Sequence, residues 1–179
     1  DTTQFTYTDG VTYTGVNFAD VAQSALYTDG AQQTQPGTTV TYAHQFFAGT
    51  EGVVSFSLSS VASPNTLLWS EVLYRDTDCD GILEAGEPII SGNYTVSANS
   101  TICLIVKQFV PANATQGAFN VVTVSSSFIY DVLVPTVTEV LSRTDTTTVG
   151  VGATSTLSLY KAVDKAVALP GETITYTIT

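Results

Sequence analysis

Apolar and polar residues alternate with a period of two along most of the chain. Val, Phe and Tyr take turns with Thr and Ser at 39–42, 53–58 and 118–124. Successive side chains of a strand point to opposite faces of a sheet, so this alternation is typical of strands. Turn residues recur between the runs at the spacing of a sandwich, and helical patterns are nearly absent. The sequence therefore predicts an all-β protein, an antiparallel β-sandwich with further strands at both ends.

An internal repeat organises the rest of the chain. The run Pro36-Gly37-Thr38-Thr39-Val40-Thr41-Tyr42 returns 134 residues later as Pro170-Gly171-Glu172-Thr173-Ile174-Thr175-Tyr176. Upstream, Ala25-Leu26-Tyr27 has a counterpart in Ser158-Leu159-Tyr160. The similarity covers two successive strands and their turn, so the chain contains one whole module and the opening of another.

Four segments follow from these patterns. We expect an N-terminal strand extension at 1–22, the sandwich module at 23–134, a linker at 135–155, and opening strands at 156–179. Two strands alone are marginal in water. Residues 156–179 are therefore expected either to continue into a second module of a longer protein or to act as a donor strand that adds to another sheet.

The charge of the chain excludes one class of function. Sixteen acidic side chains outnumber five basic ones, which gives a net charge of -11. A polyanion repels phosphate backbones, so no nucleic-acid partner is expected. No apolar run approaches the roughly 20 residues of a membrane helix, so no membrane span is expected.

Residues 76–87 match the calcium-loop pattern D-x-D-x-D-G-x5-E at every defined position. Calcium takes about six to eight oxygen ligands, and Gly81 would make the sharp turn of such a loop. Residues 67–74 and 88–96 on either side resemble strands rather than the helices of an EF-hand. We predict calcium as a structural cofactor, and a solvated acidic turn is the alternative. The expected ligands are the side chains of Asp76, Asp78, Asp80, Glu84 and Glu87 and the main-chain carbonyl of Ile82.

The two cysteines are Cys79, inside this loop, and Cys103, in the apolar run 101–106. The sequence begins at Asp1 and contains no methionine, which we interpret as a chain whose targeting segment has been removed, with a trimmed chain as the alternative. In a secreted protein a pair of cysteines is most simply a disulfide, which here would anchor the metal loop to the sheet. Two free thiols are the alternative.

Catalytic chemistry is not indicated. His44 is the only histidine, and it alternates with Val40, Tyr42 and Phe46 on one strand face, as a packed side chain would. No motif around any serine supports a nucleophile–histidine–acid arrangement, and the acidic residues cluster where a metal explains them. We therefore expect no enzyme.

Three sites match the N-glycosylation pattern within one stretch of the module, and chance matches are expected in a chain so rich in Thr. The candidate acceptors are Asn93, Asn99 and Asn113.

Three parts of the module, 40–44, 73–90 and 104–111, resemble the repeat modules of large bacterial and archaeal surface proteins, an immunoglobulin-like domain of unknown function. Residues 159–165 and 170–176 are similar to the start of such a module. The resemblance covers roughly 24–134 and 156–179. It implies an immunoglobulin-like antiparallel β-sandwich, an extracellular location at the cell surface and no enzymatic role. Cys79 departs from the family, which usually has Asn or another polar residue there.

These patterns lead to one functional hypothesis and two alternatives. The first is a structural subunit of an extracellular filament or surface layer, a homopolymer of copies joined by β-strand donation and stiffened by calcium. The alternatives are a monomeric spacer module of a long adhesin and a carbohydrate- or partner-binding module. For the last, exposed aromatic residues are needed, and the alternation of Trp69 with Leu67 and Leu73 favours core packing instead. The candidate donor-strand residues are Glu172, Thr173, Ile174, Thr175, Tyr176, Thr177 and Ile178.

Overall fold

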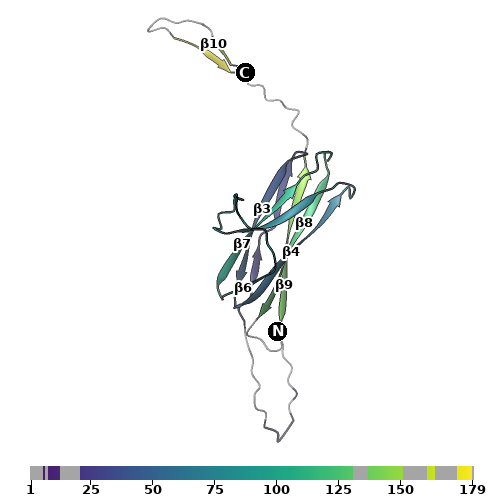
Figure 1. Ribbon diagram of the computed structural model, residues 1–179, viewed down its shortest axis with the longest axis vertical. Helices are drawn as coiled ribbons and strands as arrows, with labels where there is room; N and C mark the ends of the chain where they lie inside the picture. Colours follow the sequence, from purple (N-terminus) through teal and green to yellow (C-terminus); the bar gives the residue numbers. More distant parts are fainter. Residues whose placement is uncertain are drawn as a thin grey trace.

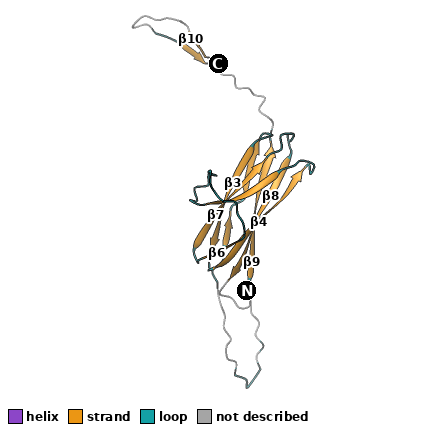
Figure 2. Ribbon diagram, in the orientation of Figure 1, coloured by secondary structure: helices purple, strands orange, loops and turns teal. Residues whose placement is uncertain are grey.

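The computed structural model describes residues 6, 8–12, 21–130, 137–150, 161–163 and 173–178. These residues form eleven strands and no helix (Figure 2). The strands are β1 (Ala25–Tyr27), β2 (Gly30–Thr34), β3 (Thr39–Ala48), β4 (Gly52–Ser63), β5 (Ser70–Asp76), β6 (Asn93–Val96), β7 (Ser100–Phe109), β8 (Phe119–Tyr130), β9 (Thr138–Val149), β10 (Lys161–Val163) and β11 (Tyr176–Ile178).

Two sheets make up the sandwich (Figure 1). The first is four-stranded, in the order β1-β3-β7-β5, and the second is five-stranded, in the order β2-β9-β8-β4-β6. All pairs are antiparallel except β2 with β9, which is parallel. Two residues separate β1 from β2, and over these residues the chain crosses from the first sheet to the second without reversing its direction. β2 therefore pairs with β9 in parallel. The predicted β-sandwich is confirmed, with this one mixed pair.

The core lies between the inner faces of the two sheets. β3 and β8 alternate strictly between buried and more exposed positions, as the sequence predicts. Phe46 of β3 and Phe128 of β8 are fully buried, and their ring centroids lie 5.6 Å apart. Aromatic pairs at this distance stabilise a core beyond the area that they bury. Trp69 and Leu67 pack partly buried against a smaller cluster formed by Val110, Ala114, Ala118 and Val149.

β7 is buried on both faces. Leu104 and Val106 face the second sheet, while Cys103 and Ile105 point outward and are nevertheless 3% and 0% exposed. The segment after β5 covers this outer face: a Cβ placed on Gly81 would lie 3.5 Å from the Cβ of Ala43, the residue paired with Ile105. The unbroken apolar run in the sequence reflects this double burial.

The expected linker at 135–155 needs correction, because β9 occupies 138–149 and pairs with β8 along its length. Its alternation is hard to recognise in the sequence, because several inward-facing positions of β9 are polar. Asp145 and Thr147 are fully buried, and each has a polar partner on β3. Residues 135, 136 and 151–155 lie outside the described residues, as do most of 1–22.

A buried polar pair joins the two sheets. His44 Nε2 lies 2.8 Å from Asp145 Oδ2, and both side chains have no exposed surface. Next to them, the Tyr42 hydroxyl lies 2.6 Å from the Thr147 hydroxyl. Burial raises the pKa of Tyr42 above its ordinary value, against the lowering effect of the Thr147 hydrogen bond, and the charge of Asp145 adds to the rise. The packed position expected for His44 is observed, with an acidic partner that the sequence pattern does not reveal.

β10 and β11 form a two-stranded sheet of their own, apart from the sandwich ladders (Figure 1). Lys161 pairs with Ile178 and Val163 with Tyr176. A shift by 134 residues places β11 on 42–44 within β3, and it places β10 on 27–29, of which only Tyr27 belongs to β1. Residues 158–160, the sequence counterpart of β1, lie outside the described residues. The described pair therefore matches the antiparallel direction of β1 with β3 but lies beside the counterpart of that ladder.

Replacing Asp145 with Ala should destabilise the sandwich by about 3 kcal/mol, because it leaves the buried His44 Nε2 without its partner. Urea unfolding followed by circular dichroism measures this change. The exposed Glu51, replaced with Ala, is the control and should change stability by less than about 0.5 kcal/mol. Equal stability of the two variants would contradict a structural role for the pair.

Candidate metal-binding loop

The acidic loop begins where the ladder between β5 and β7 ends. Asp76, the last residue of β5, pairs with Cys103 and is 3% exposed. The chain then returns along β5: Arg75 N donates to Pro88 O at 2.8 Å, and Ile90 N donates to Leu73 O at 2.8 Å. The loop therefore connects two extended segments, as expected from the sequence. Main-chain hydrogen bonds between these segments hold the two ends of the loop side by side.

The carboxylate of Asp76 shapes the first half of the loop. Its Oδ1 accepts from Cys79 N at 2.7 Å and its Oδ2 from Gly81 N at 2.9 Å. Cys79 and Gly81 have φ of 61° and 79°, in the left-handed region that glycine adopts most readily. Asp80 Oδ1 accepts from Ile82 N at 2.7 Å. These contacts fold the backbone tightly around the side chain at the first position of the motif.

Glu87 closes the second half. Its Oε1 accepts from Thr77 N and its Oε2 from Glu84 N, both at 3.2 Å. The twelfth residue of the motif thus contacts the second and the ninth. As a result, the Glu87 carboxylate, which is expected to bind calcium through both oxygens, is held in place by main-chain N–H groups of the loop.

The acidic side chains converge in two overlapping groups. Carboxylate oxygens of Asp76, Asp78 and Asp80 lie within 4.8 Å of one another, and so do those of Asp78, Glu84 and Glu87. Asp78 belongs to both groups, so the structure brings together all five predicted side-chain ligands. Ile82 follows Asp80 in the same turn, with its side chain 62% exposed.

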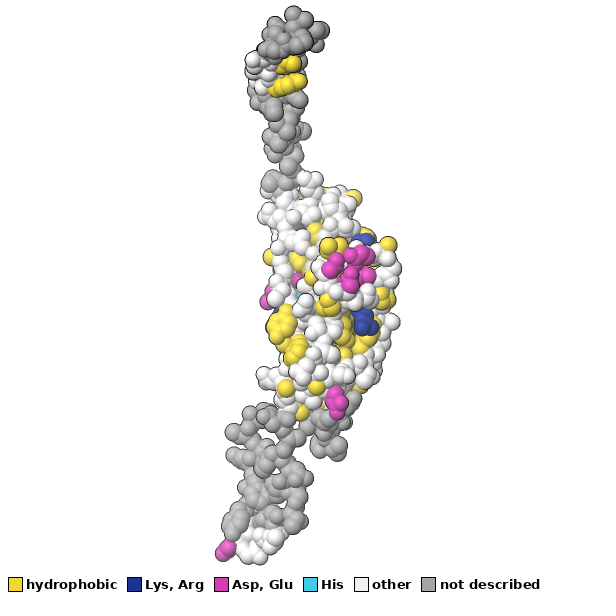
Figure 3. All heavy atoms as spheres, turned by 90° about the vertical axis from the view of Figure 1, so that its left-hand side faces the viewer, with side chains coloured by type: hydrophobic (Ala, Val, Ile, Leu, Met, Phe, Trp, Pro, Cys, Tyr) yellow, Lys and Arg dark blue, Asp and Glu magenta, His cyan; other side chains and the backbone are white. Residues whose placement is uncertain are grey.

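Electrostatics within the loop favour a cation. Loss of hydration and then the neighbouring carboxylates, Asp80 and Asp78 foremost, raise the pKa of Glu84 above its ordinary value, although its side chain is exposed. Among the described residues no Lys or Arg forms an ion pair with a loop carboxylate. Figure 3 shows acidic side chains gathered into one patch on the sandwich. The donor set consists of oxygen, which suits a hard cation such as calcium and offers nothing for metals that prefer sulfur or nitrogen.

A disulfide joins the middle of the loop to the first sheet. Cys79 and Cys103 are bonded, with their Cα atoms 5.3 Å apart. Cys103 lies on β7, opposite both Asp76 of β5 and Gln45 of β3. The bond therefore holds the loop against β7, a central strand of the sheet, beside Asp76, the first residue of the motif.

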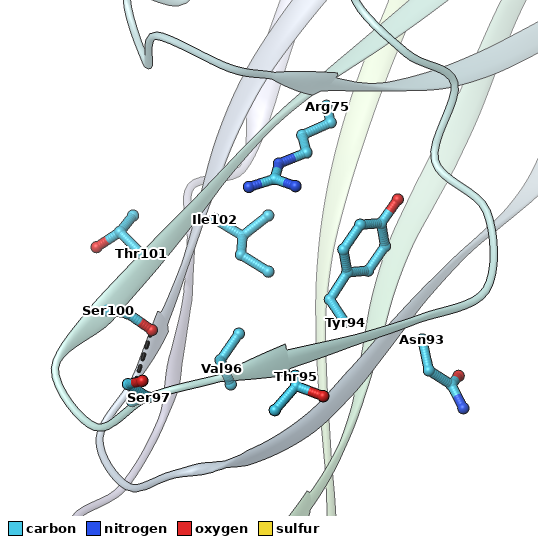
Figure 4. A pocket seen from close by; sticks show the side chains of 9 residues that line it. All are labelled: Arg75, Asn93, Tyr94, Thr95, Val96, Ser97, Ser100, Thr101 and Ile102. Carbon is cyan, nitrogen blue, oxygen red and sulfur yellow. Dashed lines mark hydrogen bonds between the residues drawn. The ribbon is translucent and has the colours of Figure 1, made fainter.

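A pocket of about 460 Å³ lies next to the loop, between β6 and the start of β7. Figure 4 shows Arg75, Ile102 and Tyr94 pointing toward one another inside it. The Arg75 guanidinium lies 5.6 Å from the centre of the Tyr94 ring, a cation–π distance. No motif in the sequence indicates this pocket, because its residues come from three strands and meet only through the fold.

The remaining candidate residues lie on the surface. The side chains of Asn93, Asn99 and Asn113 are all exposed. Among the donor-strand candidates, Thr173, Ile174, Thr175, Tyr176 and Thr177 are exposed, with Ile174 at 42% and Tyr176 at 57%, and Ile178 ends β11. Glu172 lies outside the described residues. No described segment is a helix of the length and apolarity that a bilayer crossing requires.

Comparison with known proteins gives no family. No protein-family model matches the chain, and no curated protein matches its sequence. Among solved structures, the major pilin subunit BcpA of Bacillus cereus matches 87% of this chain and 53% of its own, at 13% identity and a TM-score of 0.47.

Two further solved structures have a similarly low identity to this chain. AggA, the major subunit of aggregative adherence fimbriae type I from Escherichia coli, matches 73% of this chain and 96% of its own, at 12% identity and a TM-score of 0.39. PapD-like domain 7 of human CEP192 matches 80% of this chain and 96% of its own, at 12% identity and a TM-score of 0.43. At these TM-scores the likenesses assign neither a family nor a function.

Calcium should stabilise the chain. At a hundredfold excess over Kd, binding to the folded state alone adds about 2.7 kcal/mol, and extracellular calcium modules have Kd values of about 0.1 to 1 mM. Thermal unfolding in calcium and in EGTA measures the difference. Glu87→Gln should abolish the shift because it removes a ligand, while the matched control Glu51→Gln should retain it. Identical melting curves in calcium and EGTA would rule out the site.

Removing the disulfide should cost about 3 kcal/mol in the chain-entropy model. The double variant Cys79→Ser with Cys103→Ser should also bind calcium more weakly, because the loop loses its attachment to β7. Isothermal titration calorimetry and urea unfolding measure the two effects. Calcium affinity equal to that of the intact chain would show that the bond does not preorganise the loop.

Proposed function

We propose that this chain is a structural module of an extracellular fibre or surface layer, kept rigid by a disulfide and by calcium. One observation carries the proposal: the chain has more strand than its sandwich uses. β10 and β11 share no ladder with the nine strands of the sandwich, and Ile174 and Tyr176 remain exposed. Apolar side chains on such strands gain free energy when another sheet covers them.

The proposed location outside the cell is supported by the metal loop and the disulfide together. Disulfides persist in oxidising compartments and are rare in the cytosol. Extracellular calcium modules bind the ion weakly, which suits an exposed loop such as 76–87. The resemblance of the sequence to repeat modules of surface proteins favours the same location.

In the proposed assembly, residues 172–178 of one copy add as a strand to a sheet of the next. Such β-augmentation uses main-chain hydrogen bonds for affinity and alternate side chains for specificity. Because donor and acceptor surfaces differ, each copy offers one of each, and the result is an open polymer. Calcium would keep the first sheet of every copy stiff by neutralising the loop.

A tandem array is the second candidate, and the sequence repeat favours it. Through the repeat β11 corresponds to part of β3, and it is paired antiparallel with a strand that precedes it, as β3 is with β1, so residues 156–179 would begin a second sandwich within one long chain. The module would then be a spacer of an adhesin stalk, and isolated copies would stay monomeric.

The proposed role is mechanical rather than catalytic. His44, the single histidine of the chain, is 2% exposed and paired with Asp145, so it cannot reach a substrate.

The pocket beside Arg75 and Tyr94 would be the site of a partner if the chain were a binding module.

Light scattering and electron microscopy of the full chain over a range of concentrations test strand donation. We expect concentration-dependent polymers, and a double variant Ile174→Asp with Tyr176→Asp should lower the association constant more than tenfold, because each side chain contributes about 1.5 kcal/mol or more when buried. Val140→Asp changes an exposed apolar residue of the sandwich, 67% exposed, and should leave assembly intact. A full chain that is monomeric throughout would favour the spacer instead.

A further inference from the structure

We propose that the free edge of β4, residues Phe56–Ser63, is the acceptor site for residues 172–178 of a second copy. This inference rests on the strand donation proposed above, and it names the site at which donation occurs. It follows from the pairing of the strands and from the chemistry of the edge.

On one side, only a third of β4 is covered by another strand. Its full length, 52–63, pairs with β8, whereas β6 pairs with 52–55 alone (Figure 1). Within the part of the chain that the structure describes, residues 56–63 have no strand on that side. Their main-chain groups make no described hydrogen bonds outside the β8 ladder. An edge of eight residues is long enough to template a further strand.

The other long edges of the sandwich are covered or charged. Residues 88–90 lie along β5 and hydrogen-bond to it. β3 is partly covered by β1 and by Gln32, whose side chain donates to Thr41 O. The part of β9 that β2 leaves free carries Glu139 and Arg143, and charged side chains discourage strand addition.

The β4 edge lacks these protections. Its sequence, Phe-Ser-Leu-Ser-Ser-Val-Ala-Ser, has no charge and no proline. Phe56 and Leu58 pack against the main core yet remain only partly buried, and Val61 is 72% exposed. A strand added here would extend the second sheet and complete the cover over Phe56 and Leu58.

Residues 172–178 match the edge in length, charge and alternation. In the antiparallel direction that β6 also takes, they align with 62–56. Tyr176 then lies opposite Leu58 and Ile174 opposite Ser60 on the core side, while Thr175 lies opposite Ser59 on the outer side. Only Glu172 is charged, and it falls at the end of the alignment. The donor would exchange its three-residue pairing with β10 for seven residues on β4.

Cross-linking between two differently labelled copies tests the site. One copy carries Ser59→Cys and the other Thr175→Cys, and mixing them under mild oxidation should give a mixed disulfide at least tenfold faster than the control pair Ser142→Cys with Thr175→Cys. Ser142 is an exposed serine on β9, so it reports random encounters. Equal rates for the two pairs would overturn the site. Fast closure within a chain carrying both Ser59→Cys and Thr175→Cys, with no mixed product between copies, would also overturn it.

A second variant separates this inference from the proposed function. Ser59→Lys with Val61→Lys puts charge on the outer side of the edge and should lower the association constant at least tenfold, while circular dichroism confirms the intact fold. If this variant polymerises like the wild type, the β4 site is wrong and strand donation survives. If the wild type itself never associates, strand donation fails, and the site fails with it.

A synthetic peptide of residues 170–179 should compete with assembly. A peptide of residues 5–13, from the N-terminal extension, that competes as well or better would overturn the choice of donor.

Discussion

The ladder between β5 and β7 fixes the geometry on which the candidate metal-binding loop depends. It ends with Asp76 opposite Cys103, and so brings the first carboxylate of the motif beside the cysteine that anchors the loop. The return segment then pairs with β5, so that Asp76 and Glu87 are held near one another before any cation binds. A slip of two residues in this register would move Cys103 away from the cluster of carboxylates.

Local chemistry made part of the structure predictable. The strands, the loop with its five carboxylates and the buried position of His44 follow from alternation and motif spacing, because both act over a few residues. β9 did not follow, because Asp145 and Thr147 occupy inward positions where an apolar residue is expected. Their partners, His44 and Tyr42, lie about a hundred residues away in the sequence. The parallel β2–β9 pair was also hidden, since the sequence does not show where a strand changes sheets.

Strand edges are likewise a property of the whole fold. The sequence of β4 reads as an ordinary strand, and only the pairing map shows that β6 leaves two thirds of its length uncovered. The proposed donor segment could be recognised from its repeat, whereas the proposed acceptor could not. The pocket at Arg75 and Tyr94 has the same origin, because its walls come from β5 and β7 of one sheet and β6 of the other, and they meet only in the folded sandwich.

The covalent bridge between Cys79 and Cys103 has a consequence for a chain under tension. The bonded residues are separated by 24 positions, and the segment between them includes residues 80–87 of the acidic loop and β6. If pulling unravelled the sandwich, this stretch could not lengthen, which withholds about 80 Å of contour from the extended chain. A fibre built from such modules would lengthen less under load, and the carboxylates of Asp80, Glu84 and Glu87 would stay within the closed segment while neighbouring strands separated.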